Sequence, residues 1–333
     1  MSTVRQIARE AGVSITTVSR VLNNHPRVSQ QAREKVLAAA NKARYVANVG
    51  KRSTTTIALV YTGELAIGSP FDAALMEGMS NAMEEFDFDL MVLDANRVRQ
   101  PHETYSQMFM RKGIRGAILR CAASSRETAS MIGDEGFPAV VLGDRFDHDQ
   151  LACVYNDSIS ASREAVEHLL DLGHERIAVV TNVEDDCDHE DRLAGYAAAL
   201  ENADIAFDES LVYRVPAHRI GGATFMNRFA SMSKRPTALF ILDPITCVAA
   251  VNQAGLLGIN VPRDLSVVGF DDQEWRYMVN PPLTAVCQDA ASLGRTAFQA
   301  LRAVMQNADH AGQSDARPAW LEVHDSTAAA PAA

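Results

Sequence analysis

The 333-residue sequence lacks the short motifs by which many enzymes are recognised. It contains no Walker motif, no GxGxxG, no GxSxG and no HExxH, and no nucleophile, base and orienting residue stand in a recognisable arrangement. We therefore expect a protein that is not an enzyme and that uses no cofactor. An enzyme on an unfamiliar scaffold is the alternative, which turnover assays on bound ligands would decide.

Long apolar segments and paired cysteines are missing as well. No run of 18 apolar residues occurs, which predicts no membrane-spanning helix. The N-terminus has no apolar stretch of the kind that directs export. Five cysteines are scattered without a CxxC pair, which is typical of reduced thiols. Together these absences predict a cytoplasmic protein without membrane contact.

Charge is distributed very unevenly along the chain. The whole sequence has 31 Lys and Arg against 42 Asp and Glu, but residues 1–52 hold ten basic and only two acidic residues. The rest of the chain holds 21 basic and 40 acidic residues. A basic head on an acidic body concentrates the attraction for phosphates at one end. The head therefore predicts contact with nucleic acid, and a solvated basic domain without such contact is the alternative.

The basic head has the pattern of helices joined by a tight turn. A first helix shows apolar residues at helical spacing, namely Val4, Ile7, Ala8 and Ala11. Gly12 suits the break after it, and Ser14 can cap a second helix. That helix has an inward stripe of Val18, Val21 and Leu22 and an outward face with small polar residues and Arg20. A third helix is expected from about Ser29. This arrangement predicts a helix-turn-helix that reads DNA.

From residue 57 onward, short apolar runs alternate with helical patterns. The runs cover 57–61, 90–93, 117–119, 139–142, 177–180, 238–242 and 266–270. The helical patterns lie near 71–86, 102–112, 158–172, 190–203, 245–257 and 291–306. Alternating strands and helices predict an α/β fold with parallel sheets covered on both faces. The length favours two doubly wound units. We expect a DNA-binding domain over 1–47, a short linker over 48–56 and a two-subdomain core over 57–330.

Polar residues follow several of the expected core strands. Asp144, Asp243 and Asp271 each come directly after an apolar run, and Arg192 opens a helix. Parallel sheets bind ligands at the carboxyl ends of their strands. Converging carboxylates and an Arg can hold the hydroxyl groups of a sugar. Any single Asp at such a position can instead be a helix cap, because strand-to-helix loops favour Asp there.

Residues 184–191 read Glu-Asp-Asp-Cys-Asp-His-Glu-Asp, which raises the question of a metal site. They show neither the spacing of an EF-hand nor a second ligand pair at zinc spacing. We favour an acidic, solvated loop beside the cleft and expect no metal.

Nearly the whole chain resembles the lactose-repressor (LacI) family of bacterial transcription regulators. Residues 4–23 are similar to the opening motif of the family, which is highly specific. Further matching segments are 172–178 (LGHERIA), 192–196 (RLAGY), 235–240 (RPTALF), 261–272 (VPRDLSVVGFDD), 281–284 (PPLT) and 293–294 (LG).

The resemblance implies a DNA-binding head, a core similar to periplasmic sugar-binding proteins, and a homodimer on a near-palindromic operator. Carried over by position, Ile15, Thr16 and Arg20 would contact base edges. The positions that would contact phosphates are Thr17, Ser19 and Asn23, and Ser14 opens the same helix. In the cleft, the ligand-contacting positions of the family fall on Phe71, Asp144, Arg192 and Asp271.

The sequence departs from the family in the linker and in the cleft. The segment Tyr45-Val46-Ala47-Asn48 lacks the usual Pro, and no Leu follows before Ile57, so the usual wedge into the minor groove has no evident residue. In the cleft, Asp72 replaces a second Phe, Asp243 with Pro244 replaces an Asn-Asp pair, and Ala217 or His218 replaces an aromatic residue. Trp275 either restores a stacking surface for the ligand or packs at the subdomain crossover.

These observations predict a repressor of transcription that responds to a small-molecule effector. A carbohydrate is the first choice, because acid-rich clefts suit polyols, and a purine or another small metabolite stays open. The alternative is a sugar-binding module without regulatory DNA binding, which would leave the basic head without a role. The sequence leaves open whether the effector releases or recruits DNA and whether dimers pair into tetramers.

Overall fold

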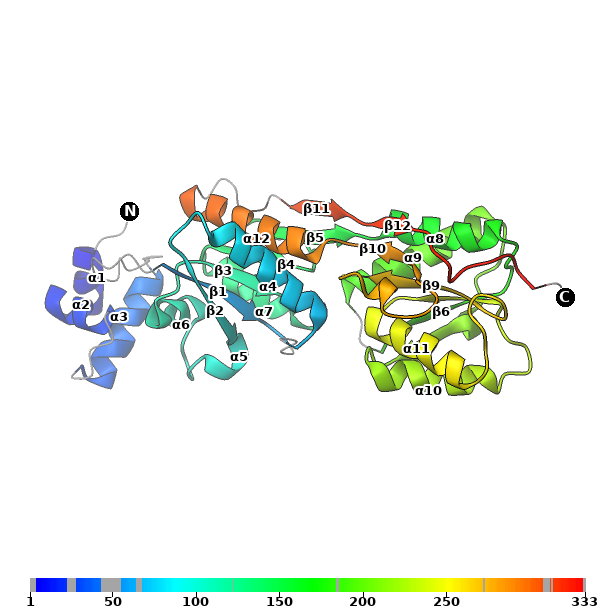
Figure 1. Ribbon diagram of the computed structural model, residues 1–333. Coiled ribbons are helices and arrows are strands. Elements are labelled where there is room, and N and C mark those ends of the chain that lie inside the picture. Colours follow the sequence, from blue (N-terminus) through cyan, green and yellow to red (C-terminus); the bar gives the residue numbers. More distant parts are fainter. Residues whose placement is uncertain are drawn as a thin grey trace.

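The computed structural model describes residues 4–22, 28–42, 55–63, 68–121, 123–183, 186–271, 273–307, 312 and 314–331. Figure 1 shows an elongated molecule in which a three-helix head precedes two α/β subdomains. Most of the linker expected over 48–56 lies outside the described residues, as does Asn23. Among the described residues, no helix has both the length and the apolar character needed to cross a membrane.

The head consists of α1 (Val4–Ala11), α2 (Ile15–Leu22) and α3 (Gln30–Lys42). Its small core comprises Ile7, Ala8, Ala11, Val18, Val21, Val36, Ala39 and Ala40. These buried residues follow helical spacing, because one apolar stripe on each helix must face the other two. The prediction of a helix-turn-helix core from the sequence is confirmed.

The N-terminal subdomain is built on a parallel sheet with the strand order β11-β5-β4-β3-β1-β2. The strands are β1 (Thr56–Tyr61), β2 (Asp89–Asp94), β3 (Ala117–Arg120), β4 (Ala139–Leu142), β5 (Ala152–Asp157) and β11 (Asp315–Pro318). Helices α4 (Pro70–Met83) and α12 (Ala290–Gln306) cover one face. The other face carries α5 (Ala95–Val98), α6 (Tyr105–Lys112) and α7 (Arg126–Asp134). The short 3-10 turn η1 (Ala123–Ser125) precedes α7.

The C-terminal subdomain repeats this plan with the strand order β12-β10-β9-β8-β6-β7. The strands are β6 (Ile177–Asn182), β7 (Val212–Val215), β8 (Ala238–Ile241), β9 (Ser266–Asp271), β10 (Thr284–Cys287) and β12 (Trp320–Glu322), and only β12 runs antiparallel to its neighbour. One face is covered by α8 (Ile159–Asp171) and α9 (Cys187–Asn202), and the other by α10 (Arg219–Ala230) and α11 (Pro244–Leu256). The 3-10 turn η2 (Glu209–Leu211) lies between α9 and β7, and η3 (Trp275–Tyr277) lies between β9 and β10.

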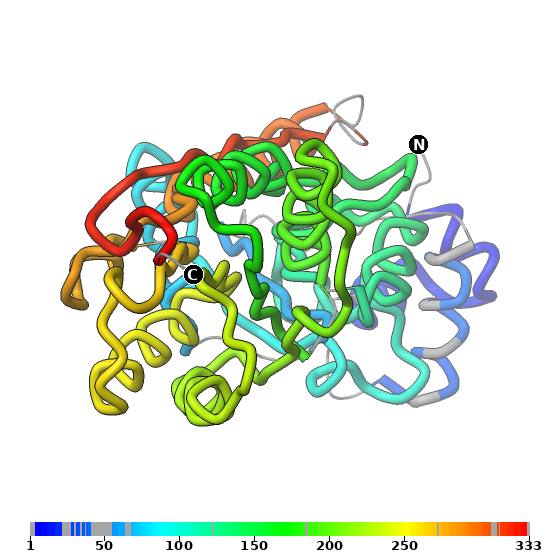
Figure 2. Tube along the Cα trace, turned by 90° about the vertical axis from the view of Figure 1, so that its right-hand side faces the viewer, coloured from blue at the N-terminus to red at the C-terminus, as the bar shows by residue number. Residues whose placement is uncertain are grey.

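The chain passes between the two subdomains three times. It crosses after β5, returns after β10 and crosses again between β11 and β12. The crossing strands lie side by side along one edge, where the backbone N–H of Ala319 donates to the carbonyl of Asp157. Figure 2 shows the C-terminal segment, in red, running beside α8, and His168 Nε2 lies 2.9 Å from Thr327 Oγ1 there.

The predicted fold class is confirmed. All seven expected apolar runs form strands and all six expected helical patterns contain helices. The sequence analysis did not assign β5, β7, β10, β11 or β12 as strands, nor α5, α7 or α10 as helices. Three of these strands, β7, β11 and β12, lie at the edges of their sheets and carry few buried residues, so they lack the continuous apolar runs that mark buried strands.

Candidate functional sites

The outward face of α2 is the first candidate site. The hydroxyl of Ser14 accepts a hydrogen bond of 3.0 Å from the backbone N–H of Thr17, which caps the helix. Val18 and Val21 are buried against the head. The opposite side exposes Thr16, Ser19 and Arg20, and half of the Ile15 side chain is accessible. A short helix with a rigid inner stripe and exposed hydroxyl, apolar and guanidinium groups can contact base edges in a major groove.

A cavity of about 250 Å³ between the two subdomains is the second candidate site. Side chains of both subdomains line it: Ser69, Pro70, Phe71, Arg120, Asn182, Asp186, Asp188, His189, Arg192, Ala217, Asp243, Pro244, Ile245, Trp275 and Gln288. Of the cleft residues expected from the sequence, Phe71, Arg192, Asp243 and Trp275 are in this set. Trp275 lies in η3, close to the crossover, so both interpretations of its role stay compatible with its position.

The other three expected cleft residues are buried carboxylates that pair with arginines of their own subdomain. Asp72 accepts from Arg120 Nε at 3.1 Å and from the hydroxyl of Tyr61 at 2.6 Å. Asp144 accepts two hydrogen bonds of 2.8 and 2.7 Å from Arg126. These carboxylates are not among the residues that line the cavity.

Asp271 is likewise satisfied by its own subdomain. It accepts from Arg276 Nη1 at 2.7 Å and from the backbone N–H groups of Gln273, Trp275 and Arg276. Its carboxylate therefore orders the segment that carries Trp275 towards the cavity.

Three helices begin at the cavity, and each is capped by a side chain that lines it. Ser69 caps α4, Asp186 caps α9 and Asp243 caps α11. The N-terminus of a helix carries a partial positive charge and unpaired N–H groups. The site is thus organised by helix ends at the carboxyl edges of both sheets, as expected for parallel α/β subdomains.

Arg192 is held rigidly in the wall of the cavity. Its side chain is buried, and its Nη1 donates to the carbonyl of Leu242 at 2.6 Å. Its guanidinium carbon lies 3.7 Å from the ring centroid of Phe270. Its Nε has no hydrogen-bond partner in the described part of the chain. A fixed guanidinium with an unused donor can hold a ligand oxygen.

The sequence analysis missed Arg120, Asp186, Asp188 and His189, which also line the cavity. The last three belong to the acidic segment that we interpreted as a solvated loop. Asp186 caps α9 by accepting a hydrogen bond of 2.8 Å from the backbone N–H of His189. The signal available in the sequence was an Asp three residues before the residue whose backbone it caps. No group of three potential metal ligands gathers in the ranges that the structure describes.

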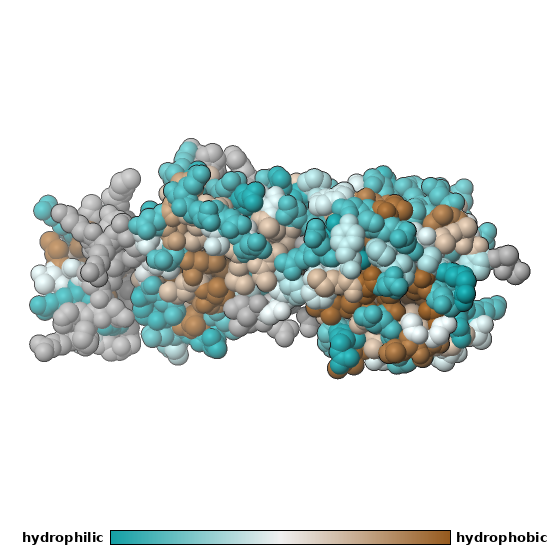
Figure 3. Space-filling view, viewed as in Figure 1, coloured by the Kyte–Doolittle hydropathy of each residue, from teal (hydrophilic) through white to brown (hydrophobic). Residues whose placement is uncertain are grey.

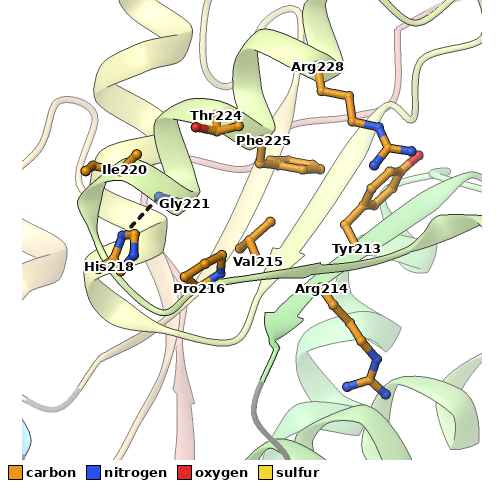
Figure 4. A pocket seen from close by; sticks show the side chains of 10 residues that line it. All are labelled: Tyr213, Arg214, Val215, Pro216, His218, Ile220, Gly221, Thr224, Phe225 and Arg228. Atoms are coloured by element: carbon orange, nitrogen blue, oxygen red, sulfur yellow. Dashed lines mark hydrogen bonds between the residues drawn. The ribbon is translucent and has the colours of Figure 1, made fainter.

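A further cavity, of about 350 Å³, lies between β7 and α10 at the outer edge of the C-terminal subdomain. Figure 4 shows Tyr213, Val215 and Phe225 gathered on one side of β7, while Arg214 points away from them. None of its ten lining residues is acidic. The cleft offers the better site for a polyhydroxylated ligand, because it combines carboxylates, guanidinium groups and an aromatic plate.

Comparisons with known proteins identify the family of the chain. Residues 3–48 match the model of bacterial regulatory proteins of the lacI family, and residues 166–327 match a periplasmic binding protein-like domain. The transcriptional regulator DegA of Bacillus subtilis is 31% identical over 302 residues, which covers 88% of each chain. The chain belongs to the lacI family. The resemblance inferred from the sequence is therefore confirmed.

Other relatives in the family extend over almost the whole chain. The ribose operon repressor of Haemophilus influenzae is 31% identical over 92% of this chain and 93% of its own. The structure of the transcriptional regulator CelR in complex with cellobiose has a TM-score of 0.71 and 27% identity, and covers 98% of this chain and 100% of that one. These relatives are transcriptional regulators and not enzymes.

Proposed function

We propose that this lacI-family regulator represses transcription by placing α2 on operator DNA, and that a small molecule bound between its subdomains controls the affinity for that DNA. The observation that carries the proposal is the combination of two separate sites on one chain. The exposed face of α2 lies at one end, and the cavity lined by Arg192 and Asp243 lies in the core.

On the head, the proposal assigns base contacts to Ile15, Thr16 and Arg20. Phosphate contacts are assigned to Thr17, Ser19 and Asn23, and Ser14 holds the start of α2. The exposure of Ile15, Thr16 and Arg20 supports these roles. In the core, Phe71, Arg192, Asp243 and Trp275 contact the effector directly.

The buried carboxylates Asp72, Asp144 and Asp271 act from behind the cavity wall. Each fixes an arginine of its own subdomain, namely Arg120, Arg126 or Arg276. A carbohydrate is the proposed effector, and the names of the ribose operon repressor and of the cellobiose complex support this choice.

The working form is proposed to be a homodimer in the cytoplasm, with a head over 1–47, a linker over 48–56 and a core over 57–330. Apolar surface over α10 and α11 supports association (Figure 3). Ile220, Leu256 and Met278 are large apolar side chains that the single chain leaves more than half exposed. Exposed apolar surface on a regulator favours burial against a second copy.

The test is a gel-shift titration of the full chain against the DNA upstream of its own gene. We expect a sequence-specific shift that a sugar of the correct class weakens or strengthens. Thermodynamic linkage requires the sugar to bind more tightly to one of two conformations that differ in their affinity for DNA. The coupling free energy between sugar and DNA binding should be roughly 1–3 kcal/mol. A specific shift that no sugar alters would refute effector control, and the loss of any specific shift would refute the proposed function.

A further inference from the structure

One carboxylate in the cleft differs from its neighbours because one of its oxygens accepts no hydrogen bond from the residues that the structure describes. Asp188 lies in the first turn of α9 and lines the cavity. Its Oδ1 is buried without a hydrogen-bond partner in the part of the chain that the structure describes. By contrast, Asp186 is bonded to His189, and Asp243 accepts from the backbone N–H of Thr246 at 2.7 Å.

The surroundings of Asp188 would otherwise suit an anion. Arg120 from the N-terminal subdomain and Arg192 from α9 both interact electrostatically with Asp188. The N-terminus of α9 adds its partial positive charge. Two guanidinium groups beside a helix N-terminus commonly bind phosphate or carboxylate. Here the protein supplies the negative charge itself, since the Asp188 side chain occupies the place of the anion.

The two arginines that line the cavity with Asp188 disfavour a cationic ligand. Burial raises the pKa of Asp188 above its ordinary value and the charge of Asp186 adds to this rise, whereas the charges of Arg192, Arg120 and His189 oppose it. A protonated amine placed against Asp188 would share the cavity with both arginines. A hydroxyl group adds no charge and can donate the hydrogen bond that the buried oxygen lacks.

We propose that Asp188 makes the cleft selective for neutral, polyhydroxylated effectors and excludes their phosphorylated or carboxylated counterparts. The proposal deepens the proposed function, on which it rests, because it takes the cleft as the effector site. A hydroxyl donates to Asp188, while a phosphate at the same place brings a second negative charge to a desolvated carboxylate. Selectivity of this kind combines one attractive contact with one repulsive contact.

The experiment compares the full-length protein with Asp188→Asn and Glu190→Gln. Glu190 lies in the same helical turn but is exposed and does not line the cavity, so its variant makes the same change of charge outside the site. Titration calorimetry uses matched ligands: ribose and ribose 5-phosphate, glucose, glucose 6-phosphate and glucosamine, cellobiose, and adenosine with its 5′-phosphate.

We expect the wild type to bind a neutral member of this panel about tenfold or more tightly than its phosphate or amine counterpart. Asp188→Asn should bind that neutral ligand roughly tenfold more weakly than the wild type does. The ratio of its affinities for the neutral ligand and for the phosphate should fall by a similar factor. Glu190→Gln should keep the wild-type preference.

Three results would overturn the assignment: a wild type that binds the phosphate or the amine at least as tightly, an Asp188→Asn variant with an unchanged preference, and a wild type that binds no neutral ligand of the panel. Gel shifts on the same preparations separate this outcome from the proposed function. If the wild type and both variants bind operator DNA specifically, the proposed function stands even when the measured ligand preference contradicts the role of Asp188.

Discussion

The guanidinium of Arg145 and the carboxylate of Asp191 form a bidentate ion pair that joins the two subdomains. Arg145 follows β4 of the N-terminal subdomain, and Asp191 belongs to α9 of the C-terminal one. Only 5% of the Asp191 side chain is exposed, against 38% of Arg145. Nearby, the thiol of Cys187 donates to the carbonyl of Gly143 at 3.5 Å, so α9 contacts the same loop twice. These polar contacts link α9 of the C-terminal subdomain to the loop that follows β4.

Removal of this ion pair should weaken the contact between the two subdomains. We expect Asp191→Asn to lower the free energy of unfolding by about 1 kcal/mol, a modest value because Arg145 is partly solvated. The midpoint of thermal unfolding should fall by roughly 2–4 °C, and effector affinity should weaken because the two subdomains that form the cavity lose a contact with each other. Differential scanning calorimetry and ligand titration measure both effects.

Arg145→Gln provides the matched control for this pair. If the two side chains act together, the double variant should be little worse than either single variant. Fully additive losses would show that the ion pair does not couple the subdomains.

Arg20 should decide sequence specificity on the DNA. Its exposed guanidinium on α2 can make a bidentate contact to guanine, which is worth about 1–3 kcal/mol of discrimination. Arg20→Ala should therefore weaken binding to the operator by roughly ten- to a hundredfold and should bind unrelated DNA almost as well as the wild type. Fluorescence anisotropy at fixed salt measures both affinities.

Arg9→Ala is the comparison variant for Arg20. Arg9 is exposed near the end of α1, and its loss should reduce the affinity for all sequences alike through the phosphate attraction of the head. Equal loss of specific and non-specific binding in Arg20→Ala would contradict base contact by this residue.

Arg192 should separate effector binding from DNA binding. Arg192→Ala removes the buried guanidinium in the cavity wall, so an effector should no longer raise the melting temperature, whereas operator binding by the head should persist. The reason is mass action, since only a ligand that binds the native state raises its stability. Thermal shift with and without sugar is the measurement. A shift that survives in this variant would place the effector elsewhere.

His174 should make the C-terminal subdomain sensitive to acid. Its Nδ1 lies 2.9 Å from Thr237 Oγ1, and its Nε2 lies 3.0 Å from both Ser266 Oγ and the carbonyl of Ala328. Burial lowers the pKa of His174 below its ordinary value of 6.5, the hydrogen bond to Ala328 partly opposes this shift, and the charge of His168 adds to it.

The unfolded chain therefore binds a proton more readily than the folded chain as the pH falls below 6.5. Stability is fully present above that pH and declines below it, by at most about 1.4 kcal/mol per pH unit for one proton. Urea unfolding at about pH 7.5 and about pH 5.5 should show a smaller difference in His174→Gln than in the wild type. An equal difference in both proteins would assign the acid sensitivity to other groups.

The sequence predicted elements wherever a local pattern reflects the packing. The buried strand β1 shows a continuous apolar run, and α2 shows an apolar stripe behind a capping Ser14. The edge strand β11, with the sequence Asp-Ala-Arg-Pro, buries little and has no such signal. Its place beside β5 follows from tertiary structure, which joins segments more than 150 residues apart.

The cleft was predicted in outline but not in detail. Of the four carboxylates predicted in loops or helix starts beside the strands, only Asp243 lines the cavity between the subdomains. The direction of each carboxylate depends on partners that are distant in sequence. Asp72 meets Arg120, 48 residues away, behind the cavity wall. Asp188 lies within an acidic run whose pattern is that of a solvated surface, and only the fold brings it towards Arg120.

The three chain crossings have a consequence for synthesis on the ribosome. The N-terminal sheet is completed by β11, and one of its faces is covered by α12, so both elements come from the last fifth of the chain. A nascent polypeptide that has emerged only as far as β10 leaves the apolar side of α4 uncovered. The N-terminal subdomain therefore cannot complete its fold until almost the whole chain has been synthesised. Chaperones that cover exposed apolar surface would be most useful during that interval.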